Sequence, residues 1–434
     1  MLNKLSDKIK NIFNDPFWKN VATLFTGTAI AQALPLLLLP VITRLYSKEI
    51  LGIYFVYASI GFISQIVVSF QFQLAIVLPK EKKDANNLLI INFVIVLAVS
   101  LLMFLFLFLF HNFISQFVKQ KELLRWLYFM PVSAFLLGIF NAISYYFNRE
   151  KEYKIISTGK VLKTLSYSVI HITFGFIGFV KSGLIGGLIV GQLISAVFLF
   201  FKLVYNTEFK FIFNVNELKS LLIKYKDIPL FNTVISFLNM LSNQLPLFLL
   251  TRFFNAEAAA DYGLANRIVT TPMGLIGQSV GQVFYQEASV IKNQNKTLEN
   301  IVKTTYKRLF KIGIIPFILL AVFAPFIFKI VFNTEYESSG QITRILIPWL
   351  FLMFLNSPLT FIITILNKQK KMIVYDVFLL ISRFVALLLG YYFFNNVLVS
   401  VIFYSIAGFI FNGILVFYFI LISKQPIKGI YADN

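Results

Sequence analysis

The chain has 434 residues, of which 58% are hydrophobic and only 13% are charged. Because an average soluble domain carries about 25% charged residues, this composition excludes an ordinary soluble globule and indicates a membrane protein with several spans. The formal net charge of +20 fits the excess of Lys and Arg on the inner side of membrane proteins, so no nucleic-acid partner is expected.

The residue types that build metal sites and nucleophilic active sites are scarce. The chain has no Cys and two His residues, His111 and His171, which excludes disulfides, thiolate metal sites and a histidine metal cluster. It also lacks a Walker lysine loop and any pair of carboxylates within one apolar run. We therefore expect a protein that is not an enzyme, with no catalytic residues, no metal and no cofactor.

Residues 1–17, MLNKLSDKIKNIFNDPF, combine apolar side chains near helical spacing with three lysines. This pattern predicts a short amphipathic helix that lies in the membrane interface. The segment lacks the apolar core of roughly 7–15 residues that a cleavable signal peptide needs.

Twelve apolar runs follow, and each is close to the roughly 20 residues that cross a bilayer as a helix. The runs are continuously apolar rather than alternating, which favours α-helices over an outer-membrane barrel. The predicted fold is therefore an all-α polytopic membrane protein with 12 transmembrane helices, at 20–43, 51–78, 88–110, 127–148, 159–180, 183–205, 228–251, 262–285, 309–332, 345–366, 373–394 and 397–422.

The spans fall into two sets of six. We predict an N-terminal lobe over 18–205, a cytoplasmic linker over 206–227, a C-terminal lobe over 228–423 and a cytoplasmic tail over 424–434. Within the linker, NELKSLLIKYKD predicts an interfacial or connecting helix. With the N-terminus inside, 28 of the 39 Lys and Arg residues lie in cytoplasmic segments and 9 in outside loops, so both termini are expected in the cytoplasm.

The two halves share a sequence pattern. QALPLLLLPVITRLYSKEILGIY, from Gln32, resembles NQLPLFLLTRFFNAEAAADYGLA, from Asn243. Because six spans per half is an even number, both halves enter the membrane from the same side, which predicts a parallel repeat. At a constant offset of 211 residues, three distinctive residue types recur: Pro35 and Pro246, Gly52 and Gly263, Gln71 and Gln282.

Prolines break the first span at Pro35 and Pro40 and the seventh at Pro246. A proline removes one backbone hydrogen bond and kinks the helix, and in lipid the freed carbonyl needs another partner. Polar residues cluster just before these prolines. The pattern predicts two bent, polar-faced helices that flank a transport cavity and act as gating kinks; the alternative is that the polar residues only hold helices together.

Several stretches resemble Wzx-type O-antigen flippases, which are polysaccharide-lipid flippases of the polysaccharide transporter family in the MOP exporter superfamily. The resemblance covers about residues 20–430 and is carried by WKNVATLFTGTAIAQALPLLLLPVITRLYSKEILGIY, LAIVLPK, YYFNREKEYKIISTGKVLKTL and YGLANRIVTTPMGLIGQSVGQVFYQEAS.

The resemblance implies a V-shaped fold of two six-helix lobes, with the first, second, seventh and eighth spans lining a central cavity. It implies that an undecaprenyl-diphosphate-linked oligosaccharide, an O-antigen or capsule repeat unit, moves from the cytoplasmic to the periplasmic leaflet of a bacterial inner membrane by alternating access. Implied partners are the lipid bilayer, a polysaccharide polymerase and a chain-length regulator. Residues 71–73 are Gln-Phe-Gln, where family members often carry Arg-Tyr-Glu. The chain therefore lacks a carboxylate at a place where one could couple transport to H+ or Na+, and the coupling ion stays open.

A diphosphate needs cations in a wet cavity, and the planar fork of Arg suits phosphate. Arg267 lies within the eighth span, and we predict that it binds the diphosphate; the alternative is snorkelling to the nearby interface. Lys160 and Lys163 share a helix face at the start of the fifth span and are predicted to attract phosphate at the inner mouth. The alternative is that these two lysines only reflect the excess of Lys and Arg on the cytoplasmic side of membrane proteins.

Asp376 and Arg383 lie seven residues apart on one face of the eleventh span. We predict that they form an intramembrane ion pair, directly or through water, with a structural role rather than a coupling-ion role. The alternative is that Asp376 sits at the membrane interface beside Lys370 and Lys371. Amide and aromatic side chains in the predicted cavity helices are the candidates for contact with sugar: Gln32, Asn239, Asn243, Gln278, Gln282 and Tyr285.

Two other functions compete with the flippase. A drug/cation antiporter of the same superfamily would need an acidic cavity, whereas the only mid-span acid in the predicted spans is Asp376. A membrane polysaccharide polymerase or ligase usually resembles proteins with one large periplasmic loop, and the longest outside loop predicted here, 112–126, is small.

Overall fold

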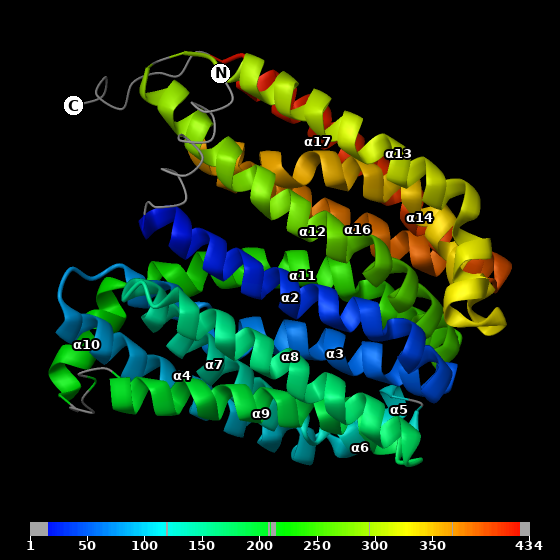
Figure 1. The fold of residues 1–434 in the computed structure, drawn as a ribbon, viewed down its shortest axis with the longest axis horizontal. Helices are drawn as coiled ribbons and strands as arrows, with labels where there is room; N and C mark the ends of the chain where they lie inside the picture. The colour runs from blue at the N-terminus through cyan, green and yellow to red at the C-terminus, as the bar shows by residue number, and fades with distance from the viewer. Residues whose placement is uncertain are drawn as a thin grey trace, which may run out of the picture. The chain divides into compact units, whose positions relative to one another are not determined.

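The computed structural model describes residues 16–118, 120–206, 209, 214–294, 296–366 and 368–425. The predicted amphipathic helix over 1–17 lies outside the described residues except for its last two, as does most of the predicted tail over 424–434. Every regular element within the described ranges is a helix (Figure 1), which confirms the all-α prediction.

Six long helices build the first compact unit, Met1–Met240. They are α2 (Pro16–Leu45), α3 (Lys48–Ser69), α4 (Lys82–Leu109), α7 (Met130–Arg149), α8 (Tyr153–Phe176) and α9 (Val180–Asn206). Shorter elements lie between and after them: η1 (Phe72–Val77), α5 (His111–Phe117), α6 (Lys121–Leu127) and α10 (Val215–Lys224). Helix α8 packs against both α2 and α9, and α7 packs against α4 and α9.

The second compact unit, Leu241–Asn434, begins inside α11 (Asp227–Phe253) rather than in the predicted linker. Its other long helices are α12 (Ala256–Asn293), α13 (Glu299–Phe332), α14 (Glu337–Asn356), α16 (Gln369–Phe394) and α17 (Val397–Ser423). Short elements connect them: η2 (Thr334–Tyr336), η3 (Ser357–Thr360) and α15 (Phe361–Ile365). Helix α14 lies at the centre of this unit, because it packs against α12, α13 and α17.

Ten helical segments in the described part of the chain are long and apolar enough to cross a membrane. The predicted fifth and eighth spans are also long helices, α8 and α12, but these two carry too many polar and charged residues to be among the ten. A polar helix at membrane depth needs protein or water beside it rather than lipid. Helices α8 and α12 are therefore the natural places to look for a polar site.

Side-chain caps fix several of the helix starts. Ser47, Asn255 and Asn396 accept hydrogen bonds from backbone N–H groups in the first turns of α3, α12 and α17, which satisfies donors that have no partner inside the helix.

The predicted second span, 51–78, is not one continuous helix. Helix α3 ends at Ser69, and Phe70 (φ 45°) and Gln71 (φ 54°) take left-handed backbone conformations before η1 begins. Each such non-glycine residue costs on the order of 1–3 kcal/mol. Burial of Phe72 and Ile76 in the apolar core of the first unit offsets that strain. The chain thus turns sharply where the apolar pattern alone predicts a straight helix.

Helix α10, in the segment predicted to hold a connecting helix, is fastened to the first turns of α4. Lys83 Nζ donates to Glu217 at 2.6 Å, and Asn87 Nδ2 donates to the other Glu217 carboxylate oxygen at 3.0 Å. Leu221, one turn further along, is buried in the apolar core of the unit. Because Lys83 donates to it, the Glu217 carboxyl has a pKa below its ordinary value.

We predict that Glu217→Gln loosens α10, because the amide loses the charge that Lys83 and Asn87 bind. Hydrogen–deuterium exchange in α10 should become severalfold faster in the variant at neutral pH. In the parent protein the contact should persist at neutral and mildly acidic pH, and should be lost only as the pH falls through the lowered pKa of Glu217. The control is Glu257→Gln, on the unrelated first turn of α12. If exchange in α10 is equally fast in Glu217→Gln and in this control, Glu217 does not hold α10 against α4.

Candidate functional site

The break at Pro35 in α2 is repaired by a neighbouring helix. Pro35 has no N–H for the carbonyl of Ala31, four residues earlier. Thr164 of α8 donates its hydroxyl to this carbonyl at 3.2 Å, and Thr164 is itself buried. Close packing makes the bond possible, since a Cβ at Gly27 of α2 would collide with Ser157 of α8. The α2–α8 contact therefore supplies the donor that Pro35 removes from α2, and the kink at Pro35 stays a prediction.

Lys160 and Lys163 lie on α8 beside this contact, and both are half-buried. Lys160 Nζ donates to the hydroxyl of Thr28 on α2 at 3.2 Å, and Lys163 Nζ lies 5.1 Å from the centre of the Phe140 ring on α7. Within the part of the chain that the structure describes, neither ammonium has a carboxylate within 4.0 Å. The first unit thus holds two neighbouring cations whose charge no described acid balances.

In the second unit, Arg383 of α16 is 2% exposed and embedded among aromatic rings. Its guanidinium carbon lies 4.7 Å from the Trp349 ring centre and 5.1 Å from that of Tyr404. One guanidinium nitrogen, Nη1, donates to Ser242 Oγ at 3.0 Å and to Asn243 Oδ1 at 3.3 Å. Arg383 therefore ties α16 to α11 just before the break at Pro246.

Asp376 lies two turns before Arg383 on α16 and is 7% exposed. Among the described residues, no ion pair within 4.0 Å and no hydrogen bond joins these two side chains. The guanidinium is instead bonded to side chains of α11. The direct contacts of Arg383 in the described part of the chain are thus with neutral polar and aromatic groups, and pairing of Asp376 with Arg383 through water stays a prediction.

Helix α12 carries Arg267, Gln278, Gln282 and Tyr285. Arg267 is half-buried and lies about three turns after the start of the helix, deeper than the predicted start of the span at 262 suggests. Gln278 and Gln282 are exposed, and the exposed ring of Tyr285 lies 5.3 Å from that of Phe361.

Two glycines mark the face of α12 that packs against η3 and α15. A Cβ at Gly277 would meet Ser357 at 2.7 Å, and one at Gly281 would meet Phe361 at 2.8 Å. These glycines let α12 pack closely on η3 and α15. Gln278 and Gln282 each follow one of these glycines, about 100° further around the helix, and both are exposed beside that contact.

The remaining predicted residues lie on α2 and α11. Gln32 and Asn239 are exposed, Pro35 and Pro40 are half-buried, and Pro246 is buried. The carbonyl of Pro40 accepts hydrogen bonds from Thr43 and Arg44.

The structure thus groups the predicted residues as Lys160 with Lys163 on α8, Asn243 with Arg383 in the second unit, and Gln278, Gln282 and Tyr285 along α12.

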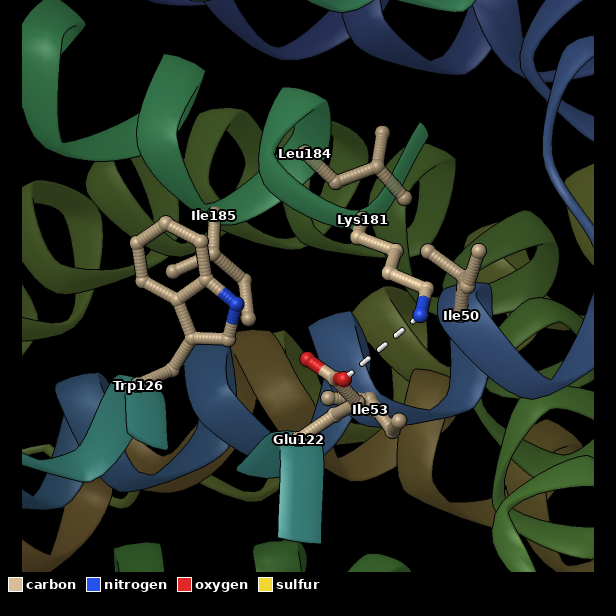
Figure 2. A pocket seen from close by; sticks show the side chains of 7 residues that line it. All are labelled: Ile50, Ile53, Glu122, Trp126, Lys181, Leu184 and Ile185. Carbon is tan, nitrogen blue, oxygen red and sulfur yellow. Dashed lines mark ion pairs between the residues drawn. The ribbon is translucent and has the colours of Figure 1, made fainter. Parts of the chain in front are cut away.

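A small pocket in the first unit is not a substrate site. It lies between α3, α6 and α9 and is lined by Ile50, Trp126 and the ion pair of Lys181 with Glu122, whose atoms are 3.9 Å apart (Figure 2). Its volume of about 20 Å³ is enough for a single water molecule. A diphosphate or a sugar needs far more room.

Several residues of these sites could not be found from the sequence. Trp349 and Tyr404 lie in apolar helices and resemble ordinary packing residues, while Thr164 and Ser242 are small hydroxyl residues among many polar side chains of α8 and α11. Two positions give a weak signal of a role beyond packing: Ser242 lies four residues before Pro246, and Thr164 follows Lys163 directly. Neither signal identifies the helix that supplies the partner.

Comparisons with known proteins identify the family and the fold of the chain. A family model described as "Polysaccharide biosynthesis protein" matches residues 41–341. The solved structure of the lipid II flippase MurJ in an inward closed conformation aligns with a TM-score of 0.71 at 14% identity, and covers 93% of this chain and 86% of its own. No curated protein sequence matches the chain significantly.

Two further solved structures have the same fold. An inward-facing multidrug resistance MATE family transporter of the MOP superfamily aligns with a TM-score of 0.64 at 15% identity, and covers 92% of this chain and 93% of its own. A MOP superfamily transporter from Pyrococcus furiosus aligns with a TM-score of 0.60 at 14% identity, over 94% of this chain and 96% of its own. These matches confirm the predicted MOP-type fold.

We predict that Thr164→Val destabilises the protein by about 1–2 kcal/mol, because the carbonyl freed by Pro35 then lacks a donor. Thr164→Ser keeps the hydroxyl and should lose much less. Pro35→Ala restores the backbone bond, so the valine substitution should cost clearly less in the Pro35→Ala background. The midpoint of thermal unfolding in detergent is measured for the parent and for all four variants. Equal losses in both backgrounds would show that the hydroxyl does not serve this carbonyl.

Proposed function

Because the chain belongs to the polysaccharide biosynthesis protein family and has the fold of MOP-superfamily transporters, we propose that it is a lipid-linked oligosaccharide flippase. Its substrate is an oligosaccharide on undecaprenyl diphosphate, a repeat unit of O-antigen or capsule. The flippase moves this lipid from the cytoplasmic to the periplasmic leaflet of a bacterial inner membrane.

The observation that carries the proposal is the pair of half-buried lysines on α8, Lys160 and Lys163, without a described acid nearby. Holding two like charges close together out of bulk water is unfavourable. A bound diphosphate removes this cost, because its oxygens accept charge-assisted hydrogen bonds from both ammonium groups. An organic cation, the substrate class of a drug antiporter, would raise the cost instead.

The rest of the substrate needs contacts of other kinds. Arg267 on α12 supplies a second, bidentate contact for phosphate. Amides on α2, α11 and α12 donate to and accept from sugar hydroxyls, and Tyr285 offers an aromatic face. The residues proposed for this role are Gln32, Asn239, Asn243, Gln278, Gln282 and Tyr285. The proline breaks in α2 and α11 are the places where these helices bend during transport.

We predict that Lys160→Gln with Lys163→Gln lowers the rate of transport at least tenfold, because each charge-assisted hydrogen bond contributes about 1.5–3 kcal/mol. Transport of a fluorescent lipid-linked diphosphate oligosaccharide in proteoliposomes provides the measurement. Lys154→Gln, an exposed lysine on the same helix, is the matched control and should transport normally. If the double variant keeps the full rate, the lysines do not bind the substrate.

Arg267→Ala is expected to abolish surface polysaccharide in cells, with the amount of membrane protein unchanged. Arg267→Lys should retain part of the polysaccharide, because an ammonium keeps the charge and loses only the bidentate geometry. Immunoblots of polysaccharide and of protein from the same cells separate loss of function from loss of folding. Normal polysaccharide in the Ala variant, with normal protein, would rule Arg267 out as the diphosphate ligand.

A further inference from the structure

The second unit contains a groove that the proposed transport site does not use. It lies between α12 and α13 and has a volume of about 310 Å³, at the small end of the roughly 300–1,000 Å³ range for small-molecule sites. Its lining residues are Ser279, Val280, Val283, Phe284 and Glu287 from α12, and Thr305, Arg308, Leu309 and Ile312 from α13.

The groove has a firm floor and an open apolar rim. Phe284 and Leu309 are buried at its base, and Phe284 belongs to the apolar core cluster that also contains Val302. Val283 and Ile312 are 51% and 53% exposed along its edges. Helix α13 is among the segments apolar enough to cross a membrane, so a hydrocarbon chain can enter the groove from the α13 side.

The charged lining residues lie at one end of the groove, toward the connection between α12 and α13. Glu287 is six residues before the end of α12, and Arg308 is nine residues after the start of α13. Both helices, of 38 and 34 residues, exceed the roughly 20 that cross the hydrocarbon, and charged residues crowd their connected ends. Glu287 and Arg308 thus fall at headgroup depth, and Val280 and Ile312 lie deeper.

Two opposite charges line the two walls of this groove without bonding to each other. Among the described residues, neither Glu287 nor Arg308 makes a hydrogen bond or an ion pair within 4.0 Å. Thr305, 8% exposed, also lines the groove and donates no described hydrogen bond. The groove therefore presents a guanidinium, a hydroxyl and a carboxylate above an apolar trough.

We propose that this groove binds a glycerophospholipid with an ethanolamine headgroup. Its phosphate accepts hydrogen bonds from the Arg308 fork and from Thr305, and its ammonium donates to Glu287. One acyl chain lies along Val280, Val283, Leu309 and Ile312.

The choice of headgroup follows from hydrogen-bonding chemistry. A primary ammonium has three N–H donors for a carboxylate, whereas a choline headgroup has none and binds best inside a cage of aromatic rings. Among the described residues that line the groove, Phe284 alone is aromatic. An anionic glycerol headgroup would leave Glu287 unpaired beside a negative lipid. The same carboxylate disfavours the diphosphate of the transported substrate, and the volume is too small for its oligosaccharide.

Native mass spectrometry of the full-length protein in detergent, titrated with phosphatidylethanolamine, phosphatidylcholine or phosphatidylglycerol of identical acyl chains, tests this site. The parent protein should retain one phosphatidylethanolamine at least tenfold more tightly than phosphatidylcholine. Arg308→Ala should lose this tight binding event, and Glu287→Gln should lower the preference for phosphatidylethanolamine over phosphatidylglycerol at least tenfold.

Lys307→Ala is the matched control, because Lys307 is exposed, adjacent to Arg308 and outside the lining; it should bind like the parent. The proposal is overturned by an unchanged headgroup preference in Glu287→Gln, by equal losses in Lys307→Ala and Arg308→Ala, or by preferential binding of phosphatidylglycerol. Displacement of the lipid by a lipid-linked diphosphate would assign the groove to the transported substrate instead. Monodisperse elution of each variant shows that it is folded, and failure of the flippase proposal leaves these outcomes unaffected.

Discussion

A carbonyl that proline deprives of its partner must find another donor when the helix lies in hydrocarbon, and much of this structure follows from that constraint. At Pro35 the donor is Thr164 from α8. At Pro325 in α13 the freed carbonyl is that of Ala321, and Arg344 of α14 donates its Nε to it at 3.0 Å. In both places the donor comes from the adjacent helix, so a bend in one helix fixes the packing of the next.

This coupling explains how the polar helix α8 is held within the first unit. Thr164 and Lys160 both bond to α2, at Ala31 and Thr28, so the polar face of α8 is turned toward the bent helix. A movement of α2 about Pro35 would therefore act directly on the side chains that we propose as diphosphate ligands. Helix α12, the other polar long helix, is held by its glycine face instead, which leaves its amides exposed.

The fold was largely predictable because it depends on the length and continuity of apolar runs, and both can be read in one sequence. The loss of a backbone hydrogen bond at Pro35 can also be read in the sequence. The group that donates to the freed carbonyl could not be predicted, because periodicity does not say which helix lies alongside. The turn at Phe70 and Gln71 escaped prediction for a related reason. Its strain is offset by tertiary burial of η1, and nothing in the local apolar pattern records that burial.

The site residues show the same limit more sharply. A spacing of seven places Asp376 and Arg383 on one face of α16, yet the structure bonds Arg383 to Ser242 and Asn243 of another helix. Helical spacing identifies residues that share a face. It does not reveal the better partners that a neighbouring helix brings closer.

The cations of the two units differ in how completely neighbouring protein groups offset the cost of removing each charge from water. Arg383 has two aromatic rings and two hydrogen-bond acceptors around its guanidinium. Its Nε has no hydrogen-bond partner among the described residues, so part of its desolvation cost is recovered within the fold, which favours a structural role. Lys160 has one neutral acceptor, and Lys163 has one ring. Their positive charge is still available to a ligand. That difference, rather than the number of cations, is why a transported anion is better assigned to the lysines of α8 than to the arginine of α16.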